Sequence, residues 1–442
     1  MSNYRIMRVC LARTEVVLNH WLSDNFKEND YQTQLAVLCS KNLVFPGSWS
    51  SSMRKLGNES TDVLIDVRPL QEVWCKENDV SIDFSNRFWM EQVFLAQILK
   101  YQPDVLYVQG GTFQRLSKNL RARIRSEVSS LRLITGFWGD ALMGEAHYRT
   151  AFSGVDVVFT ASSAYSKMFS LAGIDACLLG WGFEPNSMTY EEICSRPTNE
   201  HDVVFLGSTG FGSDLHRGRY HDLVEIAEQT NLQIWADEPS LGKKSVKIGE
   251  KNIVRKLTKT SFWAQKLIHF LSAKQLIQLR KNSLINWKVA KFLDAEMQHR
   301  KGHLPIGQFF PEGESLSELF PDRCHGPLYS RDYYDVIRES KLTLNRHRDE
   351  LADGPNIRVF EATGLGTCLI SDRGKEMDKF FDSGKEIVTF SSPQEAVEKI
   401  NYLLQHPNER KAIAKAGQDR TLKEHTIMKK CERIDQVVRA RI

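Results

Sequence analysis

One segment of the chain combines a turn, a helix start and two charged side chains in a spacing suited to a phosphorylated ligand. It reads DGPNIRVFEATGLGTCLISD and spans residues 353–372. Gly354 and the proline after it predict a turn, and Asn356 opens a helix whose N–H groups and dipole favour an anion such as a diphosphate. Arg358 and Glu361 share one helix face, where the carboxylate can accept ribose hydroxyls. The alternative is an ordinary capped helix with a surface Arg–Glu pair.

A second segment, FLGSTGFGSDLHRGR, also has the composition of an anion site. Gly207 and Ser208 follow a predicted strand, and Arg217 and Arg219 open the next predicted helix. Glycine lets the backbone approach an oxyanion closely, and arginine adds charge-assisted contacts to phosphate. The spacing matches neither GxGxxG nor GxxxxGK[ST]. The alternative is a flexible connection whose arginines are solvated.

A third segment, ITGFWGDALMGEAH, ends a predicted strand and begins a helical pattern. Asp140 follows that strand end, so we expect it near a substrate. The alternative is that Asp140 only caps the following helix. If the chemistry needs a general base, Asp140 and His147 are the candidates.

These residues follow short apolar runs that alternate with helical patterns, which predicts an α/β chain with two doubly wound parallel sheets. We predict an N-terminal Rossmann-like domain at 1–190, a linker at 191–201, a second Rossmann-like domain at 202–424, and a C-terminal helix at 425–442 that packs on the first domain. Such folds bind ligands at the carboxyl ends of their strands, so we expect a central cleft between the domains. The predicted strands are Ile6–Ala12, Asp62–Val67, Asp104–Gln109, Leu131–Phe137, Asp156–Ala161 and Gly173–Leu179, then Asp202–Ser208, Leu232–Ala236, Lys341–Arg346, Thr367–Asp372 and Glu386–Ser391.

The charge of the chain is distributed unevenly. Its net charge is +4, yet residues 241–301 hold 15 Lys and Arg against three acidic residues, which is +12, so the rest carries −8. Residues 239–335 show no clear strand pattern, and their basic part, about 241–311, is predicted to form a helical insert. It could be a solvated helical face or dock on an anionic membrane surface. The third hypothesis, nucleic-acid binding, is the weakest.

Several classes of protein are excluded by composition or spacing. No run reaches the roughly 18 apolar residues of a membrane-spanning helix, and we see no secretory leader. The eight cysteines show no zinc-binding spacing. We therefore expect a cytoplasmic, reduced protein with no bound metal or cofactor.

The run KLTLNRH…GPNIRVFEATGLGTCLISD…LLQHPNERKAIAKAGQDRTLKEHT resembles the donor-binding half of GT-B-fold glycosyltransferases. It is most similar to the branch that contains the spore maturation protein CgeB. YQPDVLYVQ, ITGFWGD and HDVVFLGS…HRGR resemble the same family in the same order. The resemblance covers about three-quarters of the chain, weakens in the first hundred residues and does not extend into 241–311.

The resemblance implies a glycosyltransferase that uses a nucleotide-sugar donor and a glycan, lipid-linked or protein acceptor. The family's acid–seven residues–Glu motif falls on Asp353 and Glu361, with Asp where Glu is commoner. Glu361 would hold the ribose, and the loop from Asp353 to Asn356 would cradle the donor sugar and diphosphate. Arg346 or His347 could assist, and Asn345, at the preceding strand end, belongs to the same expected donor site.

The family implication leaves some roles open. Arg217 or Arg219 would neutralise phosphate, and Asp140 occupies the acceptor-side position. We expect a retaining, metal-independent reaction. The alternatives are a nucleotide-sugar epimerase of the same fold and an inactive scaffold that binds a membrane or a partner.

Overall fold

The computed structural model describes residues 3–12, 29–40, 46–139, 144–185, 188, 192, 200–211, 217–236, 314–347 and 354–442. The chain forms two compact units. The first comprises Met1–Val204, Leu328–His347 and Leu351–Ile442, and the second comprises Phe205–Pro327 and Arg348–Glu350. None of the described helices is long and apolar enough to cross a membrane.

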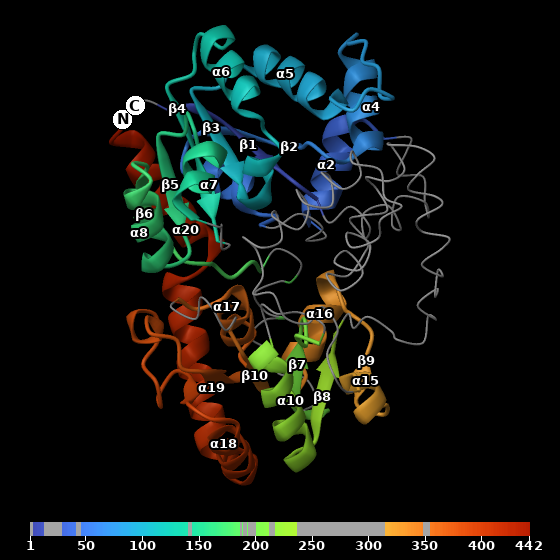
Figure 1. Ribbon diagram of the computed structural model, residues 1–442, viewed down its shortest axis with the longest axis vertical. Helices are drawn as coiled ribbons and strands as arrows, with labels where there is room; N and C mark the ends of the chain where they lie inside the picture. The colour runs from blue at the N-terminus through green and yellow to red at the C-terminus, as the bar shows by residue number, and fades with distance from the viewer. Residues whose placement is uncertain are drawn as a thin grey trace, which may run out of the picture. The chain divides into compact units, whose positions relative to one another are not determined.

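The first sheet has six parallel strands in the order β2-β1-β3-β4-β5-β6 (Figure 1). The order reverses beside β1, which is the arrangement of a doubly wound sheet. Its strands are β1 (Arg5–Cys10), β2 (Glu59–Leu64), β3 (Val105–Gln109), β4 (Leu133–Trp138), β5 (Val157–Thr160) and β6 (Asp175–Leu178). The accompanying helices are α2 (Tyr31–Ser40), α3 (Trp49–Lys55), α4 (Arg68–Glu77), α5 (Trp89–Tyr101), η2 (Gly110–Gln114), α6 (Lys118–Glu127), α7 (Gly144–Ala151) and α8 (Ser163–Leu171).

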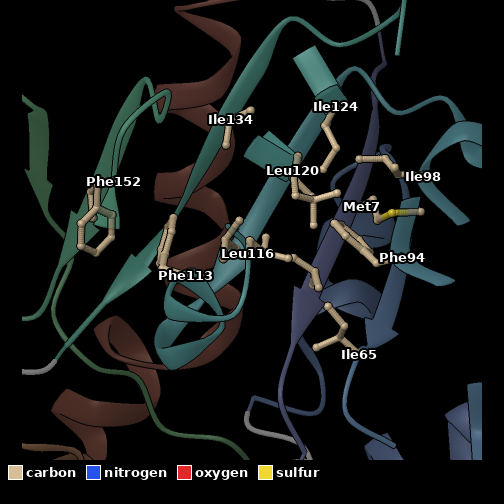
Figure 2. Packing of buried hydrophobic residues seen from close by; sticks show 14 of the residues in the cluster. Met7, Ile65, Phe94, Ile98, Phe113, Leu116, Leu120, Ile124, Ile134 and Phe152 are labelled. Atoms are coloured by element: carbon tan, nitrogen blue, oxygen red, sulfur yellow. The ribbon is translucent and has the colours of Figure 1, made fainter. Parts of the chain in front are cut away.

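The core lies on both faces of this sheet, as expected for parallel strands covered by helices. On one face, Met7 and Val9 of β1 pack with Phe94 and Ile98 of α5 and with residues of η2 and α6 (Figure 2). On the other face, Tyr4 and Ile6 belong to a separate apolar cluster that includes α3. Burial on two faces explains why β1 carries apolar residues at both alternating sets of positions, with Arg8 as a buried exception.

The second sheet has the order β12-β11-β10-β7-β8-β9. In chain order this is the 3-2-1-4-5-6 pattern of a dinucleotide-binding fold, and its reversal lies between β7 and β10. Its strands are β7 (His201–Leu206), β8 (Leu232–Trp235), β9 (Cys324–His325), β10 (Ser340–Asn345), β11 (Cys368–Asp372) and β12 (Val388–Phe390). Its helices are α10 (Arg217–Gln229), α15 (Leu316–Leu319), α16 (Ser330–Arg338), α17 (Ile357–Gly364), η4 (Met377–Lys379), α18 (Pro393–Gln405) and α19 (Pro407–Glu424).

The α/β class and the two doubly wound sheets agree with the sequence prediction, with two corrections. β2 begins at Glu59, three residues before the predicted start, because its first residues are polar and do not show a strand pattern. β9 lies where no strand is predicted, since two residues are too few to show periodicity. The predicted basic helices within 241–311 lie outside the described residues.

The last helix, α20 (Ile427–Arg439), lies beside the first sheet (Figure 1). Thr426 caps it by accepting the backbone N–H of Lys429. Its Ile434 and Val438 join the apolar cluster of Tyr4 and Ile6, and its Asp435 accepts a hydrogen bond from the Tyr4 hydroxyl at 2.8 Å. The final helix of the chain is therefore part of the core around β1.

Candidate functional site

The carboxyl ends of β10 and β11 carry a connected group of polar side chains. Asn345 is fully buried, and its Nδ2 donates to Ser371 Oγ at 2.9 Å. Its Oδ1 accepts from Asn356 Nδ2, also at 2.9 Å. These bonds join the end of β10 to the end of β11 and to the start of α17, which is the edge where doubly wound sheets bind ligands.

Asp372, the last residue of β11, receives three hydrogen bonds from the chain after β10. Arg346 Nη1 donates to Oδ2 at 2.9 Å, and the backbone N–H of His347 donates to Oδ1 at 2.9 Å. His347 Nδ1 also lies 2.6 Å from Oδ1. Burial alone raises the pKa of Asp372, but the bonds from His347 and the charge of Arg346 hold that pKa below its ordinary value. Asp372 therefore stays ionised and fixes Arg346.

His347 connects this carboxylate to the start of α17. The backbone N–H of Asn356 donates to His347 Nε2 at 3.3 Å, so Nε2 is the acceptor and the ring proton lies on Nδ1, facing Asp372. Asn356 is the N-cap of α17, with extended backbone angles. The dyad of His347 and Asp372 thus fixes where the N-terminus of α17 lies relative to β10.

The local sequence explains both ends of α17. Pro355 precedes the N-cap, and prolines favour extended backbone before a helix. At the other end Gly366 has a φ of +75°, and its N–H donates to the Thr363 carbonyl, as in a left-handed helix cap. Gly364 is the last residue of α17. A side chain does not fit at this position, because a Cβ there would be 2.5 Å from the ring of Phe183.

Glu361, one turn into α17, is buried, with 7% of its surface exposed. The Tyr333 hydroxyl of α16 donates to Glu361 Oε2 at 2.8 Å. The pKa of Tyr333 is raised well above its ordinary value, mainly by burial and next by the charge of Glu361. The charge of Arg358 opposes this rise but does not cancel it. The phenol therefore remains a hydrogen-bond donor, and the predicted partner Arg358 lies in the same electrostatic cluster.

Gly354 lies against the segment that follows β5. A Cβ at this position would be 2.8 Å from Ser162 Cβ and 3.1 Å from the Ala161 carbonyl oxygen. The next residue, Ser163, donates its backbone N–H to Glu376 Oε2 at 3.0 Å. Gly354 is therefore required here by a close backbone approach.

The second unit contains the Gly207 and Ser208 loop. Arg219 of α10 is only 6% exposed, and its Nη1 donates to the Ser208 carbonyl oxygen at 2.9 Å. Gly207 has a φ of +135°, a conformation that other residues rarely adopt. Arg219 is thus not a solvated surface arginine, because it holds the backbone of the loop. Arg217 begins α10, but its side chain is not among those described.

The structure assembles part of the predicted site. Asn345, Arg346 and Asn356 join one hydrogen-bonded group through His347 and Asp372. Glu361 forms a second group with Tyr333, and Arg358 lies in the charge cluster of that pair. Asp140 and Asp353 lie outside the described residues, as does the side chain of His147. Sequence reasoning missed the roles of Tyr333 and Asp372. The position of Asp372 at a strand end was a usable signal, whereas Tyr333 gave none.

This arrangement is suited to an anionic ligand that also carries hydroxyl groups. The N-terminus of α17 favours negative charge, and Arg346 is a fixed cation beside it. Glu361 adds a buried carboxylate one turn further along, and a carboxylate accepts hydroxyl hydrogen bonds. Asn356 Oδ1 is buried and has no hydrogen-bond partner among the residues that the structure describes.

Comparisons with known proteins agree with this picture. A family model described as glycosyl transferase-like matches residues 263–436. The chain is similar to sucrose-phosphate synthase from Thermosynechococcus elongatus, with a TM-score of 0.52 and 10% identity over 99% of each chain. It is also similar to Anabaena HepE in complex with UDP-glucose, with a TM-score of 0.51 and 12% identity over 99% of this chain and 100% of that one. No curated protein sequence matches the chain.

The solved structures confirm that the fold is GT-B, a two-domain α/β architecture. The family match corrects one expectation. It begins at residue 263, so the similarity to glycosyltransferases includes part of 241–311, where the sequence motifs alone predict none.

Proposed function

We propose that this chain is a glycosyltransferase that transfers a sugar from a nucleotide-sugar donor to an acceptor hydroxyl. The observation that carries the proposal is Glu361, a buried carboxylate one turn from the N-terminus of α17 and hydrogen-bonded by Tyr333. The glycosyl transferase-like match over 263–436 and the GT-B fold support the same class of reaction. The complex of HepE with UDP-glucose supports a nucleotide-sugar as donor.

In this proposal the donor diphosphate binds at the N-terminus of α17, beside Gly354 and Asn356. Glu361 accepts hydrogen bonds from the ribose, and Tyr333 holds the carboxylate in place. Arg346, fixed by Asp372, adds positive charge. We also propose that the loop of Gly207 and Ser208 in the second unit, with Arg217 or Arg219, is a phosphate-binding element.

The proposed reaction is retaining and needs no metal. The bond between the sugar C1 and the diphosphate oxygen breaks, and a bond forms between C1 and the acceptor oxygen on the same face of the ring. The acceptor proton passes to the leaving phosphate. Preorganised cations and backbone N–H groups stabilise the negative charge that develops on the diphosphate. Asp353 would contact the donor sugar, and Asp140 the acceptor.

The acceptor in this proposal is a glycan, a lipid-linked glycan or a protein. We propose that the enzyme acts in the cytoplasm, and that residues 241–301 attach it to the inner face of a membrane. Similarity to the CgeB-like branch rests on the sequence motifs and is part of the proposal.

The experiment that tests the function measures release of nucleoside diphosphate from a panel of UDP-, GDP-, ADP- and dTDP-sugars and of CMP from CMP-sugars. We expect release with one of them, and a loss of more than about 100-fold in Glu361→Ala. Glu398→Ala, at an exposed glutamate of α18, is the matched control and should behave as wild type. Epimerised sugar without nucleotide release, or no turnover of any donor, would contradict the proposal.

A further inference from the structure

A polar seam interrupts one apolar face of the first sheet. Tyr4, Ile6 and Cys10 of β1 are apolar and buried on this face, but Arg8, between them, is buried as well, with 0% exposed. Its Nε donates to Asp62 Oδ1 at 2.5 Å, and its Nη1 donates to the Pro46 carbonyl oxygen at 2.7 Å. Apolar residues in place of a buried ion pair often leave stability unchanged or higher, so folding alone does not explain the seam.

A cavity of about 250 Å³ lies beside this seam, between α2, α3 and β2. Its polar lining comes from Gln32, Ser40, Ser51, Arg54, Thr61 and Asp62. The two charged groups of this lining have opposite sign, and Asp62 is already paired with Arg8. The cavity therefore presents hydroxyl, amide and paired charged groups rather than a charge of one sign.

Two serines in the walls have unsatisfied hydroxyl groups. Ser50 of α3 is 2% exposed and Ser60 of β2 is 6% exposed, and both line the cavity. Among the residues that the structure describes, neither Oγ has a hydrogen-bond partner, and the same is true of Arg8 Nη2. An unpaired buried polar group costs about 1–3 kcal/mol. Both Oγ atoms are buried in the wall, so each would meet a ligand after its side chain turns to another staggered position.

We propose that this cavity binds a neutral polyhydroxyl compound of the size of one sugar ring. A volume of about 250 Å³ is large enough to hold a single sugar ring. Hydroxyl groups both donate and accept, so the same ligand can pair with the serines and with Asp62. The proposal concerns residues of α2, α3 and β2 and does not depend on the proposed donor site at α17.

The test is saturation-transfer NMR on the full chain with D-glucose, N-acetyl-D-glucosamine, glycerol and glucose 6-phosphate. We expect a neutral sugar to bind in the millimolar range. Ala36→Trp, at an exposed position of α2 that lines the cavity, should weaken binding at least tenfold. Asn119→Trp, at an exposed position of α6, is the control and should bind the sugar as wild type does. No binding of any neutral sugar, equal binding to Ala36→Trp, or tighter binding of glucose 6-phosphate would overturn the proposal.

A second pair of variants separates binding from a structural role. Ser50→Ala and Ser60→Ala should each weaken sugar binding about 5- to 10-fold, as expected for a hydrogen bond of about 1 kcal/mol. Neither should lower the melting temperature without ligand, because each removes an unpaired hydroxyl. A lower melting temperature with unchanged sugar binding would refute the assignment.

The same variants identify the source of the sugar ring. If the ring belongs to a transfer acceptor, Ala36→Trp lowers the rate of transfer while UDP affinity stays unchanged. If it is a free metabolite, basal transfer in Ala36→Trp equals that of wild type, and only the response to added sugar is lost. Both outcomes agree with a sugar site. If the chain transfers no sugar at all, binding of the sugar to the cavity can still be measured by saturation-transfer NMR.

Discussion

Replacing Tyr333 by phenylalanine removes one oxygen from the proposed donor site and leaves the ring in place. That oxygen donates to Glu361 Oε2 at 2.8 Å, and Glu361 is only 7% exposed. The variant therefore leaves a buried carboxylate with one donor fewer, while the packing of the ring is preserved. A change in donor binding would then come from the hydroxyl itself.

The expected size of the effect comes from the charge and burial of this pair. A hydrogen bond to a charged group contributes about 1.5–3 kcal/mol. About 2 kcal/mol corresponds to a factor of roughly 30 in an equilibrium constant. We expect Tyr333→Phe to lower the unfolding free energy by about 2 kcal/mol and to raise the donor KM by about 5- to 30-fold. kcat should stay within about threefold, because Tyr333 acts through Glu361.

The chain offers a matched control. Tyr402 of α18 donates to Glu409 Oε2 at the same distance, 2.8 Å, but is 48% exposed. Exposed pairs of this kind contribute at most about 0.5 kcal/mol. Tyr402→Phe should therefore leave both stability and KM unchanged. Urea denaturation gives the stability of each variant, and calorimetric titration with the nucleotide of whichever donor is turned over gives the affinity for the nucleotide part.

A double-mutant cycle with Glu361→Gln completes this test. If Tyr333 acts only by holding Glu361, the double variant should lose about as much donor affinity as Glu361→Gln alone. Fully additive losses would refute the reasoning, since they would mean that the two side chains act independently. Wild-type donor affinity in Tyr333→Phe, together with reduced stability, would restrict Tyr333 to a structural role.

Four further predictions address other parts of the molecule. Asp372→Asn should lower the free energy of unfolding by about 3 kcal/mol at pH 7. Because the pKa of Asp372 is lowered in the folded state, the greater stability of the wild type should disappear as the pH falls below about 4. A difference in melting temperature that does not change with pH would contradict this prediction. Burial lowers the pKa of Lys430 in α20 to about 8. The stability of the wild type should therefore rise relative to that of Lys430→Met between about pH 8 and pH 10.5. If the unfolding free energies of the two proteins change with pH in the same way, Lys430 does not titrate as described. Gly354→Ala should cost about 1–3 kcal/mol by overpacking against Ser162 and weaken UDP binding, whereas wild-type melts and affinity would show that the contact yields. If 241–301 docks on membranes, the chain should float with anionic but not neutral liposomes, and more weakly at high salt; no salt-sensitive flotation would end that hypothesis.

Much of the donor-side geometry follows from local sequence. The helix at 357–364 begins and ends where the sequence predicts, because Pro355 and Gly366 restrict the backbone through interactions with near neighbours. The strands β10 and β11 also match their predicted runs, since burial on both faces selects continuous apolar stretches. Each of these sequence patterns spans no more than about ten residues, so it can be recognised without the tertiary structure.

The partners of the predicted site residues do not follow from local sequence. Glu361 is bonded by Tyr333, 28 residues earlier, and Asp372 is 25 residues from His347. Each pair meets only because strand order brings the ends of β10 and β11 and the helix α16 together. The alternative of a surface Arg–Glu pair does not describe Glu361, which is a buried carboxylate that accepts a hydrogen bond from Tyr333.

By itself, the sequence determined the class of fold, the positions of most strands and helices, and the residue types near the N-terminus of α17. Only the tertiary structure decided that Arg8 pairs with Asp62 beside a polar cavity, and that Asp435 of the last helix bonds to Tyr4 of the first strand. The physical reason is the range of the interactions. Secondary structure responds to neighbours within a few residues, whereas a buried polar group is satisfied by whatever the completed fold places beside it.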